Sequence, residues 1–322
     1  MTRYIALRLL QAIVVIAVMS FVIYGLIGLM PGDPIDVMVS SNPNLTPDDA
    51  RRLKALYGLD RPIHERYGAW AAAALGGDLG YSRAFGQPVL SVIGPRLLNT
   101  LQIMGLAFAL SLAIALPAGV LAARYPGSLA DRWINLACFA GISLPTFWLA
   151  LILMLIFAVM LNLLPAGGMA TVGAPLAGWA WLADRLKHLI LPVATLALVN
   201  IAGYTRYLRA AMIETLGEDY IRTARAKGVP ERVVLWRHAL RNALLPVVTI
   251  VALEMGVLFS GALVTETMFA YPGMGKLIYD AILGNDFNLA LAGLLMATLV
   301  TLIANLAADL AYAWLDPRIA YG

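Results

Sequence analysis

Residues 97–123, LLNTLQIMGLAFALSLAIALPAGVLAA, form a run of apolar and small polar side chains without a charged residue, and this run decides the fold class. The run is longer than the roughly 20 residues that a helix needs to cross the hydrocarbon core of a bilayer. Because a single helix satisfies its own backbone hydrogen bonds in lipid, we expect this run to be a transmembrane helix.

Five further runs have the same character, since charged side chains are rare near the bilayer centre. The composition agrees, because 61% of the 322 residues are hydrophobic and only 13% are charged, far more apolar surface than a soluble domain buries. The sequence therefore predicts an all-α integral membrane protein with six transmembrane helices. These are expected at residues 9–30, 97–123, 134–163, 189–205 with its flanks, 243–265 and 289–310.

Residues 134–183 carry no charge at all and are too many for one helix. Pro165, Gly167 and Gly168 interrupt the apolar pattern, so we expect a loop after residue 164. Trp179 and Trp181 make this loop look interfacial rather than spanning, because tryptophan is enriched at the membrane–water boundary. A re-entrant segment is the alternative interpretation.

Basic side chains flank the apolar runs unevenly, and this asymmetry predicts the orientation. Short loops rich in lysine and arginine stay on the cytoplasmic side, so both termini are expected in the cytoplasm. The two short outer loops then hold only Arg185, Lys187 and Lys276. The net charge of +4 does not indicate a nucleic-acid partner, because the charges gather at the ends of apolar runs.

The spans divide the chain into four expected parts. These are a cytoplasmic N-terminus with the first span (1–30), a small extracytoplasmic element (31–96), a core with five spans (97–315) and a cytoplasmic tail (316–322). In the extracytoplasmic element Thr46 can cap a helix that has Pro47 at its first position. The spacing of Leu53, Leu56 and Tyr57 predicts that this helix is amphipathic.

The longest predicted cytoplasmic loop is residues 206–242, and from 217 to 246 the chain reads GEDYIRTARAKGVPERVVLWRHALRNALLP. Gly228 is expected to end one helix, while Pro230 and Glu231 suit the first turn of the next. The result is a helix-turn-helix. The apolar residues expected to share one face of its second helix are Val229, Val233, Trp236 and Leu240.

Such a face, exposed to the cytosol, is suited to docking in a groove of a partner protein. Three other interpretations stay open at this point: a helix lying on anionic lipid, a DNA-reading helix-turn-helix, and a solvated loop. Composition by itself favours docking and lipid contact about equally.

Several motifs resemble one family of proteins. Residues 219–228 and 238–246 are similar to the cytoplasmic signature loop of ABC importer permeases, most closely the dipeptide, oligopeptide, nickel and glutathione branch. Three more stretches resemble the same branch, so the resemblance covers nearly the whole chain: 29–34, 269–275 and 316–319. The signature of the broader superfamily begins with Glu-Ala-Ala, whereas Arg222, Thr223 and Ala224 stand here. This departure puts a role of the glutamate in doubt, but not the helix-turn-helix.

The resemblance implies a type I ABC importer fold in a bacterial inner membrane, with a division of labour among subunits. This chain and a second, related permease, expected to form a heterodimer, would make the pathway for di- or oligopeptides or a related solute. Two cytosolic subunits would bind ATP and Mg, an extracytoplasmic binding protein would deliver the solute, and this chain would bind no cofactor. Dipeptides, oligopeptides, a nickel complex and glutathione all stay possible as solutes. The residues expected to couple to the ATPases are Tyr220, Ala224, Ala226, Lys227, Gly228, Val233, Trp236, His238, Arg241 and Asn242.

Polar residues inside the predicted spans are candidates for the translocation path. Glu254 lies near the middle of the fifth span and can either face the path or pack at a subunit interface. Ser260, Asn200 and Asn305 are weaker candidates, and Asn200, Asn305 and Asp309 can equally form hydrogen bonds between helices. Outside the membrane, a turn at Tyr271, Pro272 and Gly273 can close the external mouth, contact the binding protein or serve only as a turn.

Catalytic motifs are absent from the sequence. It has no His-Glu-x-x-His or phosphate-binding Gly-x-x-x-x-Gly-Lys-Ser/Thr motif, its three histidines fall in different loops, and its single cysteine, Cys138, lies in an apolar run. We therefore expect neither an enzyme nor a metal site. The main alternative is an ion-coupled secondary transporter or channel acting without an ATPase, although its typical inverted repeats are not evident.

Overall fold

The computed structural model describes residues 2–29, 46–56 and 60–315, and some side chains within these ranges, those of 252–261 among them, lie outside the description. The chain divides into two compact units. The first comprises Met1–Asn99 with Gly273–Leu302, and the second comprises Thr100–Pro272 with Ile303–Gly322. Within the described ranges nearly all regular structure is helical, which confirms the predicted all-α class.

Among the described residues, the first unit contains six complete regular elements and the starts of two long helices. Its members are α1 (Thr2–Gly28), α3 (Pro47–Leu56), α4 (Ile63–Leu75), β1 (Tyr81–Ser82), β2 (Gln87–Pro88), the start of α5 (Val89–Arg124), α12 (Met274–Leu283) and the start of α13 (Phe287–Leu315). The predicted helix at Thr46 is α3. Thr46 Oγ1 accepts a hydrogen bond from the Asp49 amide at 3.3 Å, and the Thr46 amide donates to Asp49 Oδ2 at 3.0 Å. The Thr46 hydrogen bonds hold the pKa of Asp49 below its usual value.

Helix α4 packs on α1 through aromatic side chains. Phe21 and Tyr67 form an edge-to-face pair with ring centroids 5.2 Å apart, while Tyr24 lies 5.7 Å from both Tyr67 and Trp70. The Tyr67 hydroxyl also lies 2.7 Å from Ser20 Oγ. These contacts fix part of the predicted extracytoplasmic element to the first predicted span.

The antiparallel hairpin of β1 and β2 is tied to the turn between α12 and α13. Asp286, buried at 2% exposure, accepts hydrogen bonds from Ser82 Oγ at 2.5 Å and from the Ala84 amide at 2.9 Å. Arg83 donates to the Gly284 carbonyl, and Asn288 Nδ2 donates to the Tyr81 carbonyl at 3.1 Å. A buried carboxylate with several donors is stable in this position because its charge is compensated.

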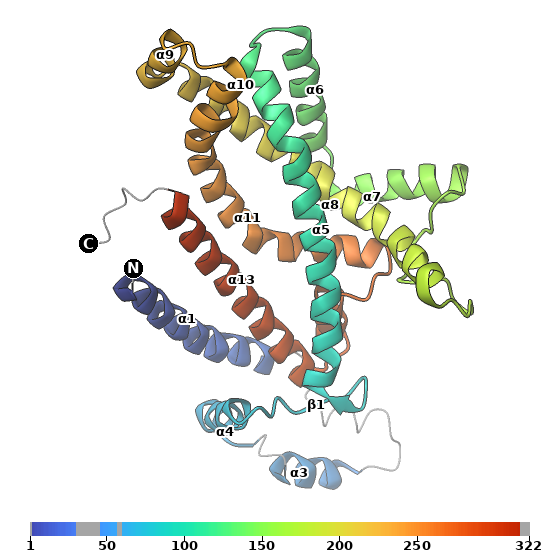
Figure 1. Ribbon diagram of the computed structural model, residues 1–322. Coiled ribbons are helices and arrows are strands. Elements are labelled where there is room, and N and C mark those ends of the chain that lie inside the picture. Colours follow the sequence, from blue (N-terminus) through green and yellow to red (C-terminus); the bar gives the residue numbers. More distant parts are fainter. Residues whose placement is uncertain (1, 30–45, 57–59, 316–322) are drawn as a thin grey trace. The chain divides into compact units, whose positions relative to one another are not determined.

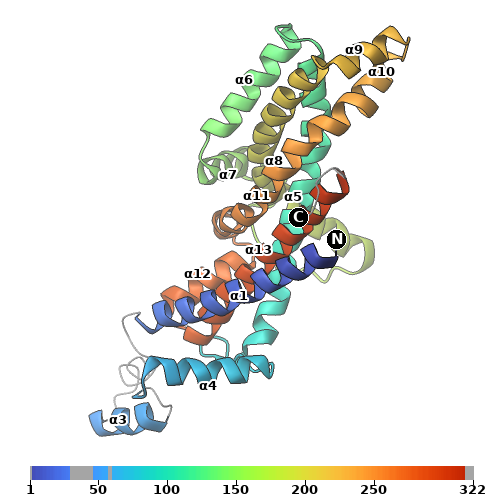
Figure 2. The ribbon, with the colours of Figure 1, turned by 90° about the vertical axis from the view of Figure 1, so that its left-hand side faces the viewer.

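The second unit is organised around α8 (Gly178–Leu216). Helices α6 (Leu129–Ser143), α7 (Thr146–Met154) and α11 (Leu240–Met268) all contact it (Figure 2). The π-helix η1 (Leu155–Met160) follows α7. Between α8 and α11 lie α9 (Asp219–Ala226), α10 (Glu231–Val233) and the π-helix η2 (Val234–Ala239). Figures 1 and 2 show α9 and α10 at the same end of this unit as the turn between α5 and α6.

Four helical segments in the described part are long and apolar enough to cross a membrane, or five if a bent pair is one span. They are Ala6–Gly28, Val89–Arg124, Gly178–Leu216 and Phe287–Ala307, and the pair is Leu129–Ser143 with Thr146–Met160. The predicted fifth span, residues 243–265, lies within the 29 residues of α11. The count of six spans and the orientation of the termini stay predictions.

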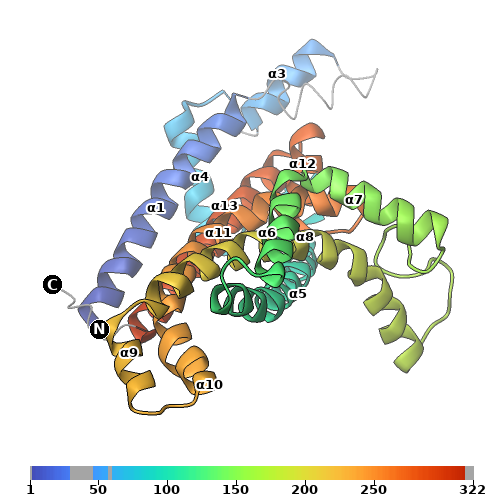
Figure 3. The same cartoon turned by 90° about the horizontal axis from the view of Figure 1, so that it is seen from above.

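The predicted third span, residues 134–163, is not one straight helix. It bends by 103° between α6 and α7 (Figure 3). Leu144 takes an extended conformation with φ −87° and ψ 125°, the region that the ring of Pro145 favours for the residue before it. The loop predicted after residue 164 is present between η1 and α8, but Trp179 and Trp181 lie in the first turn of α8 rather than in the loop.

Candidate functional site

Residues 217–242, called the hairpin below, form the predicted helix-turn-helix. Gly217 ends α8, and α9 begins two residues later at Asp219. Gly228 adopts φ +74°, a left-handed conformation that glycine accepts without steric cost, and this reverses the chain into α10. The Val229 amide donates to the Ala224 carbonyl at 3.2 Å and closes the turn. The predicted stop at Gly228 is therefore confirmed.

A single apolar cluster joins the base of the hairpin to three long helices. Ile221, Val234 and Ala239 are fully buried in it. The other buried members come from α5, α8, η2 and α11: Val120, Ala123, Leu208, Met212, Leu235, Leu240, Ala243 and Val247. Close packing of these side chains joins the base of the hairpin to the ends of these helices.

The second helix of the hairpin exposes only part of the predicted apolar face. Val233 and Trp236 are 36% and 46% exposed, whereas Leu240 is buried. Val234 and Leu235 fill the core in their place. The physical reason is η2, because a π-helix places more residues in each turn than an α-helix and shifts the side chains that follow. The predicted single face of four apolar residues was wrong, since Val233 and Trp236 are exposed, Leu240 is buried, and Val229 is partly buried against the core cluster.

Polar contacts hold the two arms of the hairpin together. Arg225 donates two hydrogen bonds to the Glu231 carboxylate, from Nε at 3.1 Å and from Nη2 at 2.8 Å. Asn242 Nδ2 donates to the Tyr220 hydroxyl at 2.6 Å. The Arg225 hydrogen bonds keep the pKa of Glu231 below its usual value, although burial alone would raise that pKa. The charge of Arg124 also lowers the pKa of Glu231.

The other predicted coupling residues lie along the same hairpin. Ala226, Lys227 and Arg241 are exposed, whereas Ala224 and His238 are partly buried. The exposed surface therefore combines two apolar side chains with several basic ones. This composition suits a protein partner with an apolar groove and an acidic rim.

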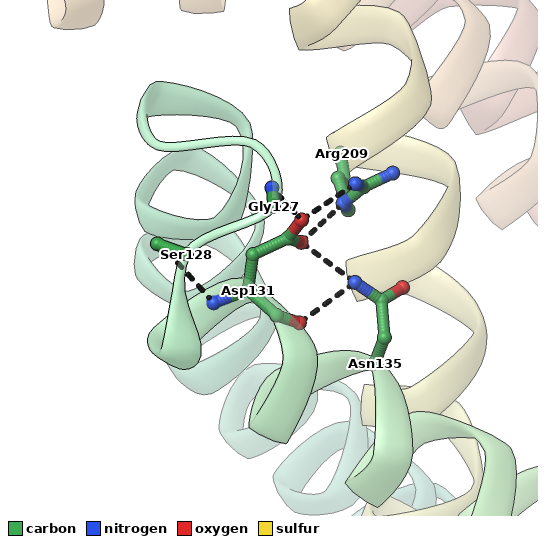
Figure 4. A network of polar contacts seen from close by, with 5 residues as sticks. All are labelled: Gly127, Ser128, Asp131, Asn135 and Arg209. Atoms are coloured by element: carbon green, nitrogen blue, oxygen red, sulfur yellow. Dashed lines mark hydrogen bonds and ion pairs between the residues drawn. The ribbon is translucent and has the colours of Figure 1, made fainter.

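An ion pair near the base of the hairpin was not predicted from the sequence. Arg209 of α8 donates to both oxygens of Asp131 of α6, from Nε at 2.6 Å and from Nη2 at 2.8 Å (Figure 4). Asp131 also accepts from the Gly127 amide at 2.8 Å and from Asn135 Nδ2 at 2.6 Å. Ser128 caps α6 by accepting from the Asp131 amide. The Ser128–Asp131 cap is visible in the sequence, but the pairing with Arg209, 78 residues away, is not.

The turn at residues 269–273, predicted to lie outside the membrane, is largely buried. Tyr271 is 1% exposed and packs against Ile103, Leu189 and Val193, and burial is the main cause that raises the pKa of its hydroxyl. Pro272 is partly buried, and Gly273 is buried and precedes α12. In this conformation Tyr271 is therefore a core residue.

The loop before α8 is fitted closely to the same turn. The Gly168 amide donates to the Phe269 carbonyl at 2.8 Å. A Cβ atom on Gly167 would lie 2.4 Å from that carbonyl oxygen, so only glycine fits there. Thr171 donates to Asp184 from its amide at 2.8 Å and from its hydroxyl at 2.6 Å. The sequence marked these glycines only as breakers of the apolar run.

The predicted path residues lie on three helices, α8, α11 and α13. Asn200 on α8 is partly buried, and its side-chain nitrogen has no hydrogen-bond partner among the described residues. Asn305 on α13 is exposed. Glu254 and Ser260 lie within α11, but their side chains are outside the described part. Glu266, which the sequence interpretation passed over, is fully buried and accepts a hydrogen bond from Thr100.

Three or more metal-ligating side chains do not come together anywhere among the described residues. The hairpin presents Val233 and Trp236, and its base is fused to the ends of α5, α8 and α11.

Comparison with known proteins places this arrangement in a family. Residues 115–321 match the family described as binding-protein-dependent transport system inner membrane component, and residues 1–104 match the N-terminal region of such components. The chain is 38% identical to the oligopeptide transport system permease protein AppB of Bacillus subtilis over 322 residues, covering both chains completely. It is 34% identical to the dipeptide transport system permease protein DppB of Escherichia coli K12, covering 100% of this chain and 99% of that protein.

A solved structure shares the fold. A chain of the MetNI methionine ABC transporter in an inward-facing conformation aligns with a TM-score of 0.55 at 16% identity, over 70% of this chain and 97% of that chain. The matches to both family regions and the full-length relatives lead to one conclusion. This chain belongs to the family of binding-protein-dependent transport system inner membrane components.

Proposed function

We propose that this chain is the permease subunit of an ATP-driven importer of di- or oligopeptides, and that its hairpin docks on a cytosolic ATPase. The observation that carries the proposal is the full-length match, at 38% identity, to a protein named as an oligopeptide permease. The exposed pair Val233 and Trp236, on a hairpin rooted in the helical core, supports the docking role.

The hairpin has two properties that a coupling element needs. Its base is part of the same apolar cluster as the ends of α5, α8 and α11, so a push on it reaches three long helices together. Its exposed surface offers an aromatic and an aliphatic side chain beside basic groups. Closure of the ATPases on ATP would therefore displace these helices through the hairpin.

The remaining subunits are part of the proposal. A second, related permease would complete the pathway, two ATPase subunits would hold ATP and Mg, and an extracytoplasmic binding protein would deliver the solute. The bacterial inner membrane is the setting that fits the family description. Both termini, and the hairpin between them, would lie on the cytoplasmic side.

The path itself is assigned from the sequence. Glu254 is the first candidate for a contact with a charged peptide, followed by Ser260, Asn200 and Asn305. A Glu254→Gln variant that alters uptake of cationic relative to anionic peptides supports this assignment. An unchanged profile across such peptides favours a packing role for Glu254.

Purification of the chain from cells that express the whole transporter tests the proposed function. We expect two ATPase subunits to be retained, and Trp236→Ala to weaken their retention while leaving the chain in the membrane. Trp179→Ala is the matched control, because Trp179 is also exposed but lies in the first turn of α8. Uptake driven by protons or sodium ions with this chain alone, or equal retention by both variants, would overturn the proposal.

A further inference from the structure

We propose that the Arg225–Glu231 ion pair is a positioning element that sets the angle between the two arms of the hairpin, and thereby the direction in which Val233 and Trp236 point. This inference rests on the proposed function, because that direction matters only if a partner docks on the hairpin. Neither Arg225 nor Glu231 was among the residues expected to couple to the ATPases.

The first observation is that the tip of the hairpin contributes no buried residue to the apolar core, although the partly buried Val229 packs against it. Every residue from Arg225 to Arg232 is exposed or only partly buried. The buried residues of the hairpin lie outside this stretch: Ile221 on one arm, and Val234, Leu235, Ala239 and Leu240 on the other. Packing therefore holds the base of the hairpin through several buried residues but the tip, residues 225–232, through Val229 alone, so other contacts contribute to the angle at the tip.

The second observation concerns the turn itself. Gly228 has a left-handed backbone, and a Cβ atom there would meet nothing within 4 Å. No neighbouring group among the described residues braces the turn from that side. Glycine is also the residue with the greatest backbone freedom, so the turn needs a second restraint to hold one geometry.

The ion pair supplies that restraint, because it crosses the turn. Arg225 lies in the last turn of α9 and Glu231 in the first turn of α10. The guanidinium contacts the two carboxylate oxygens through two nitrogens, at 3.1 and 2.8 Å. A two-point contact of this kind fixes orientation as well as distance, which a single contact does not.

The arms are also joined at their other ends. The hydrogen bond from Asn242 to Tyr220, at 2.6 Å, links the start of α9 to the start of α11. With one link at the base and one at the tip, α9 and the segment from α10 to η2 form a closed frame. Val233 lies two residues after Glu231, so a change of angle at the tip moves it directly.

A second ion pair on the hairpin provides a matched control. Arg222 and Asp219 are 3.3 Å apart, three residues apart in sequence and both on α9. Their side chains are more exposed than those of Arg225 and Glu231. Because this pair lies within one helix, its loss cannot change the angle between the arms.

The experiment uses the complete transporter reconstituted in liposomes. Uptake of a mixed pool of dipeptides and pentapeptides is measured by mass spectrometry, and ATP hydrolysis by phosphate release. The variants are Arg225→Ala, Glu231→Ala, the double variant and Arg225→Lys, with Arg222→Ala and Asp219→Ala as controls. Retention of the ATPases and the thermal unfolding temperature are recorded for each.

We expect each alanine variant of the positioning pair to lower the peptide taken up per ATP hydrolysed by about threefold or more, with a double variant no worse than either single one. Arg225→Lys should recover part of the uptake per ATP hydrolysed, since lysine keeps the positive charge but cannot contact the carboxylate through two nitrogens. The unfolding temperature and the control variants should change little. This combination separates positioning from a merely structural role.

Two results would contradict either the positioning role of the pair or the proposed function. If the wild-type chain retains ATPases and couples uptake to hydrolysis, but the pair variants match the controls, the positioning role is wrong and the proposed function stands. If the wild-type chain retains no ATPase, the proposed function itself is wrong. Additive losses in the double variant would also reject the pair as one element.

Discussion

Two arginine–carboxylate pairs of the second unit have nearly the same geometry in different surroundings. Asp131 and Arg209 join α6 to α8 with side chains 5% and 26% exposed, and Glu231 and Arg225 join the arms of the hairpin with side chains 37% and 42% exposed. Asp131 has additional donors in Gly127 and Asn135. Glu231 has the nearby charge of Arg124.

Because of this difference in burial, the two ion pairs contribute differently to the stability of the protein. Removing one partner of a buried pair leaves a charge without compensation, so the fold depends on the pair. An exposed pair is worth at most about 1 kcal/mol, because water solvates each partner after separation. The Asp131–Arg209 pair therefore stabilises the corner between α6 and α8, while the Arg225–Glu231 pair is suited to setting a direction.

The largest expected effect comes from breaking the buried pair. Asp131→Ala should lower the free energy of unfolding by about 3 kcal/mol, because Arg209 stays partly buried without its carboxylate. Denaturant unfolding of the detergent-purified protein measures the change. Asp219→Ala removes an exposed carboxylate and serves as the control. Equal small losses in both variants would remove the distinction between the two pairs.

A purely steric contact sharpens the comparison, because it involves no charge. Gly167→Ala should cost about 2 kcal/mol, since its Cβ atom would lie 2.4 Å from the Phe269 carbonyl oxygen and the backbone must shift. This loss should therefore not depend on salt. Gly105→Ala, where a Cβ atom meets nothing within 4 Å, is the control. Tolerance of Gly167→Ala would show that the loop and the turn move apart readily.

The contact of two Arg209 nitrogens with the Asp131 carboxylate is tested by a variant that keeps the positive charge at position 209. Arg209→Lys should cost about 1 kcal/mol, because lysine is a point charge that cannot reproduce both contacts to Asp131. The unfolding measurement used for Asp131→Ala applies. A cost as large as that of Asp131→Ala would mean that the two-nitrogen geometry of Arg209 matters more for stability than its positive charge.

The smallest expected effect is the pH dependence of the exposed pair. The Glu231 pKa is lowered in the folded protein, so its stabilising contribution is present above its usual value of 4.5 and is lost as the pH falls through the folded value. The difference in stability between the wild type and Glu231→Gln should be below about 1 kcal/mol at pH 7 and shrink below pH 4.5. Unfolding curves from pH 7 to pH 3.5 measure it. A difference that grows with acidity contradicts the sign.

Local sequence patterns were enough for much of the fold. The apolar runs at residues 9–30, 97–123, 189–205 and 289–310 coincide in large part with α1, α5, α8 and α13, because hydrophobicity along a helix is a property of neighbouring residues. The turn at Gly228 was also predictable, because a glycine that ends a helix is a local signal in the sequence. The bend before Pro145 carried a local signal too, in the proline itself, which the length of the uncharged run concealed.

Long-range contacts were beyond the reach of such patterns. The face exposed by the hairpin depends on η2, and the residues that form this π-helix show no distinctive pattern. The pairing of Asp131 with Arg209 depends on how α6 lies against α8. The need for glycine at position 167 arises only because Phe269, far along the chain, lies beside it.

The sequence by itself determined that this chain is helical, spans a membrane and carries a charged hairpin, since the cost of charge in lipid acts on each segment separately. The tertiary structure decided which side chains of that hairpin are exposed, which carboxylates find arginines, and where a side chain does not fit. Those outcomes depend on distances between segments remote in sequence, which close packing sets only when the whole unit is assembled.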